Sequence, residues 1–287
     1  MASDLLKNML TEAFNREAFY SNYNRTFSIV EANTDELREE CYKLRYEVYC
    51  IENDFEDPTR NPNQMERDTY DIDAVHFLMV HNESGKPAGT VRVVLPKEEM
   101  EMDSFPMQEL CDHPILHTPG RPAKLCQISR LCMSKHFRRR DNDGSVLPAY
   151  YEQENIKGTQ NGNMVYIRRR IPYAPLGLLR AAFEVAIKNR IADCVMFIES
   201  DQLRNFEKMG IAYKVLGPKI AYHGEQQPVI FNIKNVLDTM LIDNLACWEI
   251  ISDMGRLHKL ANGLHQNSWQ DGVMDNLRWD DVHKKLS

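Results

Sequence analysis

Charged residues stand inside otherwise apolar segments between residues 44 and 130, and this pattern constrains the fold more than any other feature of the sequence. Four blocks carry it, in the order LRYEVY (44–49), DTYD (68–71), GTVRVVLP (89–96) and QISR (127–130). A charged group is costly to bury unless a partner is buried with it. The blocks therefore predict one small α/β unit whose arginines and carboxylates meet in a polar pocket.

The chain is long enough to bury a full core. Of its 287 residues 43% are hydrophobic and 27% are charged, as in soluble globular proteins. No run approaches the ~18 apolar residues of a membrane-spanning helix. Asp4, Lys7 and Glu12 interrupt the start of the chain, unlike a secretory signal. We therefore expect a cytoplasmic protein without an integral membrane segment.

The cysteines, histidines and net charge argue against several classes of protein. The seven cysteines include no CxxC pair. The nine histidines show no HxH spacing and a single HxxxH pair, His113 and His117, so we expect neither a disulfide framework nor a metal site. A net charge of −7 fits nucleic-acid binding badly. A basic cluster could still dock a small acidic partner, or be a solvated loop; it comprises Lys135, Arg138, Arg139 and Arg140.

The order of elements predicts an α/β fold with a mixed central sheet flanked by helices. We expect helices over 4–17, over 34–50 with Asn33 as N-cap, from Pro175, from Ser200 or Asp201 to Gly210, and from residue 236 onward. We expect strands at 26–30, 75–81, 90–95, 125–133, 194–198, 212–216 and 229–233. An irregular excursion is expected at 141–163.

Strand alternation gives the arginines two different settings. Arg92 shares a strand face with Thr90 and Val94, so that face must open on a cavity, a partner carboxylate or solvent. Gln127 and Ser129 share one face of a later strand. Arg130 is expected on the opposite face.

The helix and the loop supply the other charged groups. Arg45 and Tyr49 lie four residues apart, on one face of a helical turn. Asp68 and Asp71 precede a strand and could hold a cationic amine or orient an arginine. Asp71 could also simply cap a turn.

In this order the blocks, extended to DTYD with AVHFL and to QISRLCMSK, resemble the acyl-homoserine-lactone synthase-like acyltransferases of the GNAT superfamily. The closest branches are the bacterial PEP-CTERM/exosortase-associated acyltransferases and the N-acyl amino acid synthases. The resemblance covers roughly residues 30–233. It implies a GNAT-like domain over 1–235, on which a helical extension over 236–287 would pack.

The resemblance also implies a function. The amine of a small acceptor, an amino acid, would attack a fatty-acyl thioester carried on the phosphopantetheine of acyl carrier protein, with no tightly bound cofactor. By position it assigns catalytic roles to Arg92, Asp71, Gln127 and Arg130. It assigns substrate binding to Arg45, Tyr49, Asp68 and Ser129.

Gln127 departs from the family pattern, which has a glutamate three residues before the second strand arginine. A glutamine cannot take a proton from an ammonium group, whereas a glutamate can. The base would then be Asp71, or Asp68 acting through a water. A changed acceptor or a non-catalytic acyl-binding or lipid-binding relative are the alternatives.

The donor can be judged from the segment after the 125–133 strand. Acetyl-CoA-dependent GNAT enzymes usually carry a glycine-containing loop there, whose backbone N–H groups cradle the pyrophosphate. SKHFRRRDNDGSVLP (134–148) has no such glycine pair. We therefore favour acyl carrier protein, docked on Lys135 and Arg138–Arg140. An acetyl-CoA-dependent N-acetyltransferase is the alternative.

Overall fold

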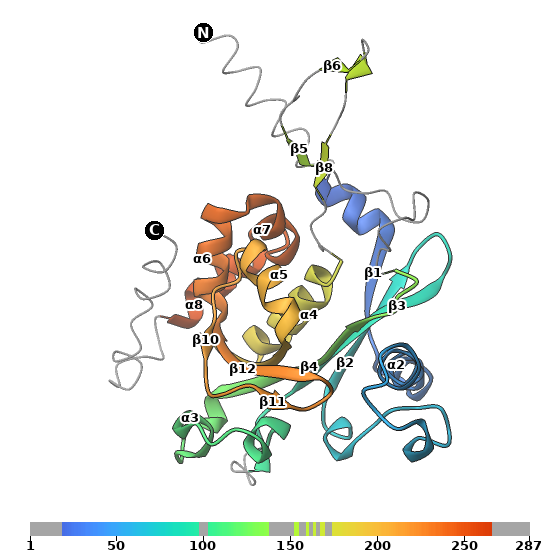
Figure 1. Cartoon of the computed structure of the whole chain (residues 1–287). Helices are drawn as coiled ribbons and strands as arrows, with labels where there is room; N and C mark the ends of the chain where they lie inside the picture. The colour runs from blue at the N-terminus through green and yellow to red at the C-terminus, as the bar shows by residue number, and fades with distance from the viewer. Residues whose placement is uncertain are drawn as a thin grey trace.

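A mixed sheet with helices on both faces forms the body of the protein, as the element order predicted (Figure 1). The computed structural model describes residues 19–97, 103–137 and 174–265, and the backbone of short strands between residues 152 and 169. In this part of the chain an eight-stranded sheet has the order β1-β2-β3-β4-β9-β12-β10, and β11 pairs with β12. Its strands β4 and β9 are parallel.

The strands of the sheet are β1 (Phe27–Glu31), β2 (Val75–His81), β3 (Lys86–Val94), β4 (Leu125–Met133), β9 (Asp193–Glu199), β10 (Lys214–Val215), β11 (Ile220–Ala221) and β12 (Glu225–Asn232). The helices are α2 (Asp35–Tyr46), α3 (Pro114–His117), α4 (Leu176–Lys188), α5 (Leu203–Lys208), α6 (Ile233–Asp243), α7 (Leu245–Ile251) and α8 (Arg256–His265). A π-helix, Glu47–Glu52, continues α2. Short 3-10 turns lie at Pro58–Arg60, Thr69–Asp71, Pro106–Glu109, Pro122–Lys124 and Ser200–Gln202.

Two helix starts differ from the sequence prediction. Thr34, and not Asn33, is the N-cap of α2, because its side chain accepts a hydrogen bond from the Leu37 N–H. Neither Ser200 nor Asp201 caps α5, which follows Gln202 without a side-chain cap. Gly210 follows this helix with a φ of +80°, the conformation expected of a glycine at a helix end.

Other differences concern the ends and the excursion. Residues 19–26 are helical, whereas the helix predicted over 4–17 lies outside the described residues. Short strands, not irregular chain, account for parts of the 141–163 region. They are β5 (Glu152–Glu154), β6 (Thr159–Gln160), β7 (Asn163–Met164) and β8 (Ile167–Arg169), with β5 paired to β8 and β6 to β7.

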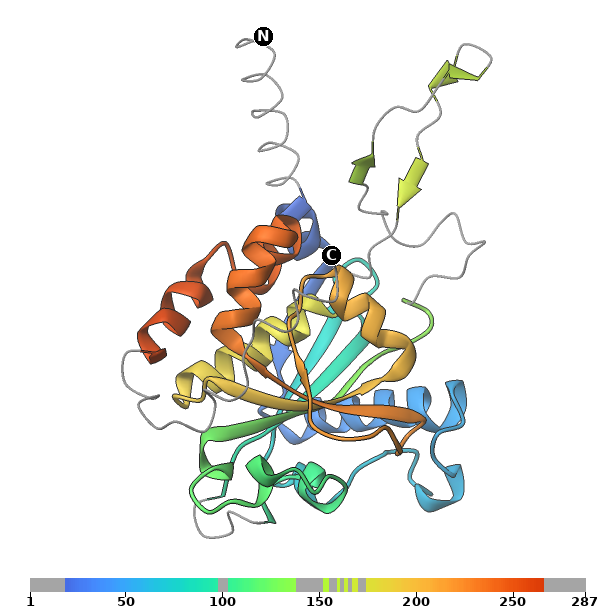
Figure 2. The same ribbon diagram turned by 60° about the vertical axis from the view of Figure 1, so that its left-hand side comes forward.

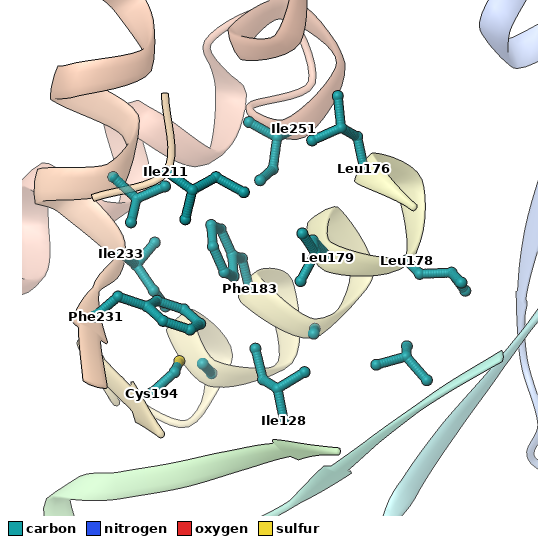
Figure 3. Packing of buried hydrophobic residues seen from close by; sticks show 14 of the residues in the cluster. Ile128, Leu176, Leu178, Leu179, Phe183, Cys194, Ile211, Phe231, Ile233 and Ile251 are labelled. Carbon is teal, nitrogen blue, oxygen red and sulfur yellow. The ribbon is translucent and has the colours of Figure 1, made fainter. Parts of the chain in front are cut away.

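One face of the sheet carries the larger hydrophobic core. Helices α4, α6, α7 and α8 gather on this face, and α2 lies on the other (Figures 1 and 2). Leu179 and Phe183 of α4 point between Ile128 of the sheet and Ile251 of α7 (Figure 3). The described part of the C-terminal segment therefore shares its core with the sheet. The domain boundary at residue 235 stays a prediction.

The opposite face holds two smaller apolar clusters. Leu44 of α2 packs with Leu78 of β2 in one cluster. Val94 of β3 packs with Phe105 and Met107 in the other. Arg92, two residues before Val94 and fully buried, lies on the same face of β3. A polar site is thus built between two apolar clusters.

A β-bulge in β4 alters the alternation of its side chains. Arg92 pairs with Ser129 and Thr90 pairs with Cys132, so that Arg130 and Leu131 together face Val91. Arg130 adopts a φ of +52°. The bulge turns its side chain toward the face of Arg92, and the prediction of the opposite face was wrong.

The parallel pairing of β4 with β9 covers Leu125–Ile128, and the two strands part beyond that point. The parting exposes the bulged half of β4 to the segments that build the site. None of the helices among the described residues has both the length and the apolar character needed to cross a membrane.

A glycine at the β3–β4 contact supplies a test of this packing. A Cβ on Gly89 would lie 2.3 Å from Sδ of Met133 and 2.9 Å from the backbone oxygen of Cys132. Because the backbone cannot yield cheaply, Gly89→Ala should destabilise the protein by about 1–3 kcal/mol in urea unfolding. Gly263→Ala in α8, where a Cβ meets nothing within 4 Å, should stabilise by up to about 1 kcal/mol. Equal stability of the two variants would contradict the close contact.

Candidate active site

Arg45 anchors a buried cluster of charges on the α2 face of the sheet. Its guanidinium is 0% exposed and makes a bidentate pair with Asp71, with Nη1–Oδ1 at 2.7 Å and Nη2–Oδ2 at 3.0 Å. Its Nε donates to Oε2 of Glu66 at 2.5 Å. The helix thus fixes two carboxylates of the loop that precedes β2.

Arg92 brings β3 into the same cluster. Its Nε donates to Oγ of Ser129 at 2.9 Å, and its Nη1 donates to Oδ1 of Asp68 at 2.6 Å and Oδ1 of Asp71 at 2.8 Å. Its Nη2 is buried and has no hydrogen-bonding partner among the described residues. A buried N–H without a partner is unusual and points to a bound group.

Arg130 closes the cluster from β4. Its Nη2 donates to Oε1 of Glu66 at 2.8 Å and to Oδ2 of Asp68 at 3.0 Å. Its Nη1 donates to Oη of Tyr222 at 3.2 Å, and its guanidinium lies 5.8 Å from the ring centroid of Tyr49. The π-helix after α2 and the β11–β12 hairpin therefore meet at this arginine.

The cluster neutralises itself. Burial alone would raise the pKa of Glu66, but Arg45 and then Arg130 outweigh it and lower the pKa to about 2. Burial likewise opposes ionisation of Asp71, yet Arg45 and then Arg92 hold its pKa well below the ordinary range. Three carboxylates face three arginines, so none of the arginines is left over as a free cation within the described residues.

The two aspartates of the DTYD block both orient arginines and cap a turn, whereas their binding of an amine stays a prediction. Asp68 caps the Thr69–Asp71 turn by accepting from the Tyr70 N–H, and Asp71 accepts from the Asp68 N–H in return. The turn therefore orients both carboxylates toward the arginines. The Asp68 side chain is 27% exposed, against 4% for Asp71, so Asp68 is the more accessible of this pair.

Gln127 lies apart from these charge contacts. Its Oε1 accepts from the Met107 N–H at 2.9 Å, and the residue is buried. It ties β4 to the segment around the Pro106–Glu109 turn, which is a structural contact.

Of the predicted basic cluster, Lys135 is exposed at the turn after β4, whereas Arg138–Arg140 lie outside the described residues.

Glu66, Tyr222 and His223 were missed by the sequence analysis. Glu66 stands in a loop without periodicity, and only its two arginine contacts reveal it. Tyr222 and His223 come from a hairpin far along the chain.

Among the described residues, no three His, Cys, Asp or Glu side chains are arranged to hold a metal ion. All seven cysteines are buried and free.

Comparisons with known proteins agree with this architecture. Residues 44–146 match the family profile described as Acetyltransferase (GNAT) domain. No curated protein sequence matches the chain significantly. Among solved structures, TofI in a ternary complex with an inhibitor and MTA aligns with a TM-score of 0.51 at 18% identity, over 77% of this chain and 100% of that chain.

Two further structures align less well. BjaI, a CoA-dependent acyl-homoserine lactone synthase solved with SAM and isopentyl-CoA, gives a TM-score of 0.49 at 16% identity, over 84% of this chain and 99% of that chain. FeeM, an N-acyl amino acid synthase from uncultured soil microbes, gives a TM-score of 0.47 at 11% identity, over 76% of this chain and 97% of that chain.

Residues 44–146 therefore match a GNAT acetyltransferase domain, and this match with the fold indicates an acyltransferase. The fold resembles that of TofI, and at 18% identity this likeness defines the fold alone. Neither the donor nor the acceptor follows from it.

The cluster should dominate stability. Arg45→Met removes the cation between Glu66 and Asp71 and should destabilise the protein by about 3–5 kcal/mol at pH 7, measured by urea unfolding. Arg38→Met, which breaks an exposed pair with Asp35, should cost less than about 1 kcal/mol.

The effect should also depend on pH. The folded-state pKa of Glu66 lies below its ordinary value of 4.5, so its contribution is present above about pH 4.5 and is lost as the pH falls toward 2. The wild-type and Arg45→Met stabilities should therefore converge over this range. A deficit that stays constant down to pH 2 would contradict the ion-pair origin.

Proposed function

We propose that this protein is an N-acyltransferase that moves a fatty-acyl group from acyl carrier protein to the amine of an amino acid. The proposal includes the cytoplasmic location inferred from the sequence. The observation that supports the acceptor site is the hydrogen bonding of the Arg92 guanidinium. On Arg92, Nη1 is bound to Asp68 and the neighbouring Nη2 has no partner among the described residues.

Asp68 and Nη2 of Arg92 together suit a zwitterionic amino acid. The partly exposed Asp68 can hold the ammonium group of an amino acid, while Nη2 of Arg92 can donate to its carboxylate. Asp68 also contacts Arg92 and Arg130, but its side chain is 27% exposed. The other two carboxylates of the cluster are buried, so they shape the site without competing for the acceptor. Arg45, Asp71 and Arg130 then act by holding Asp68 and Arg92 in place.

The reaction would be aminolysis of a thioester. The amine nitrogen attacks the carbonyl carbon, a C–N bond forms, the C–S bond breaks, and the pantetheine thiolate leaves. Gln127 takes no part in proton transfer in this scheme, because its amide is bound to the Met107 backbone. Its role is to position β4.

The turn after β4 supports the choice of donor. Both carboxylate oxygens of Glu52 accept from the Lys135 N–H, at 3.0 and 2.9 Å, and Oε1 also accepts from Oγ of Ser134 at 3.1 Å. An anionic side chain thus occupies backbone and hydroxyl donors where the pyrophosphate of a coenzyme A donor would be expected. The single phosphate of a carrier protein needs fewer donors, and Lys135 with Arg138–Arg140 would attract its acidic surface.

The donor is tested by supplying each candidate donor separately. The protein is incubated with a long-chain acyl carrier protein or with acetyl-CoA, each with a mixture of amino acids, and N-acyl products are sought by mass spectrometry. We expect product from the carrier-protein donor. Product from acetyl-CoA alone would favour the N-acetyltransferase alternative. Ligand binding without product from any donor would favour a non-catalytic relative.

The acceptor site is tested at Asp68. Asp68→Asn keeps the shape of the side chain and removes its charge, so kcat/KM for the amino acid should fall by about 10²-fold, that is by about 2.7 kcal/mol. Asp73→Asn, five residues on and 62% exposed, is the matched control and should behave as wild type. Equal loss in both variants would remove Asp68 from the acceptor site.

The role of Glu52 is tested by binding of coenzyme A. Glu52→Gln keeps an acceptor for the Lys135 N–H but removes the negative charge, and should tighten coenzyme A binding by roughly tenfold in calorimetry. Glu47→Gln controls for net charge, because Glu47 lies in the same π-helix and pairs with His136 instead of Lys135. Unchanged binding in Glu52→Gln would show that its carboxylate does not exclude this donor.

A further inference from the structure

We propose that His223, oriented by Glu56, takes the proton from the attacking amine. This inference rests on the proposed function. It supplies a general base, a role that the glutamine at position 127 cannot fill. His223 lies at the tip of the hairpin between β11 and β12, far in sequence from the four charged blocks.

The hairpin tip holds the imidazole in place. His223 and Gly224 both have positive φ, +49° and +93°, and a Cβ on Gly224 would lie 3.2 Å from Cε1 of Phe55. The imidazole centroid is 4.1 Å from that of Tyr222 and 5.5 Å from that of Tyr49. Backbone strain of this kind persists where the surrounding structure enforces it, often at functional sites.

The same contacts bring the ring to the charge cluster. Tyr222 accepts from Nη1 of Arg130, and Tyr49 lies under the guanidinium of that arginine. The imidazole therefore borders the Arg130 side of the cluster, where Asp68 is also bound. Because Asp68 and Tyr222 bind the same arginine, an acceptor ammonium on Asp68 would lie on the same side of the cluster as the hairpin tip.

The two ring nitrogens differ in their surroundings. Nδ1 of His223 lies 2.9 Å from Oε1 of Glu56, although the two are not aligned as a hydrogen bond. Nε2 is buried and has no hydrogen-bonding partner among the described residues. The side chain is 9% exposed. A carboxylate beside Nδ1 favours the tautomer with its proton there, which leaves the lone pair of Nε2 free to accept.

The neighbouring groups are poor bases by comparison. Glu66 and Asp71 are buried, and arginines hold their pKa values far below neutrality. His76 is 2% exposed, and its Nε2 is bound to the Asp71 backbone oxygen. Burial, followed by Arg130, lowers the pKa of His223 to about 4, against about 2 for Glu66, so at pH 7 its imidazole is neutral and is a stronger base than that carboxylate.

The proton and the electrons are accounted for in one sequence. The bound ammonium first loses one proton to solvent, and the lone pair of the neutral amine then forms the C–N bond with the thioester carbonyl. The nitrogen becomes positively charged and acidic as this bond forms, and it gives its second proton to Nε2. The C–S electron pair leaves with the pantetheine sulfur, which the imidazolium then protonates. Glu56 stabilises the imidazolium while it exists.

The test uses His223→Ala in the full chain, with carrier-protein donor and amino acid acceptor. We expect kcat to fall by roughly 10²-fold with little change in the acceptor KM, and added imidazole to restore part of the rate. His136→Ala, at a side chain that is 70% exposed, is the control and should keep the wild-type rate. Near-wild-type kcat in folded His223→Ala, or a loss that imidazole does not relieve, would overturn the proposal.

Glu56→Gln gives a second, independent measurement. It should lower kcat by about tenfold alone and add little in the double variant with His223→Ala, because both act in one step. Full additivity would overturn the coupling. A wild-type protein that makes no N-acyl product from any donor would refute the proposed function, whereas an active wild type with a fully active His223→Ala refutes this inference alone.

Discussion

The buried ion cluster is the interaction on which the rest of this face depends. Its members come from α2, the loop before β2, and strands β3 and β4, so each element is held by a charge on another. Buried ion pairs seldom stabilise a protein more than well-packed apolar side chains would, because the charges must leave water. Their value here lies in position: the cluster separates two apolar clusters and fixes where Asp68 and Arg92 stand.

The backbone is adapted to that cluster. The bulge in β4 lets Arg130 join Arg92 on one face, and the departure of β9 after Ile128 leaves the bulged half of β4 to contact other segments. The π-helix after α2 carries Tyr49 against Arg130 and Glu52 against Lys135. A single irregular turn therefore links the charge cluster with the turn after β4.

The sequence predicted the regular parts best. Strands β2 and β4 have the predicted bounds, since their apolar runs are bounded by clear turn signals. The order of the blocks also anticipated that Arg45, Asp68, Asp71 and Arg92 meet. Strand alternation failed for the face of Arg130, because a bulge changes the alternation without a sequence signal. Nor does the sequence indicate that Gln127 accepts from a backbone N–H twenty residues earlier, and its catalytic role stays a prediction. Glu66 and His223 stand in loops, where contacts over long sequence separations decide position.

Because the charges within the cluster balance, its carboxylates are suited to orienting a ligand and not to taking a proton. A carboxylate that is bound by two arginines is fixed in place, but the same charges that fix it lower its pKa and make it a weaker base than a group outside the arginine pairs. A site built in this way can hold and orient an acceptor. In the proposed reaction its base would come from a group outside the arginine pairs. Gln127, which is bound to the Met107 N–H, fits that arrangement because it places no carboxylate on β4 at this position.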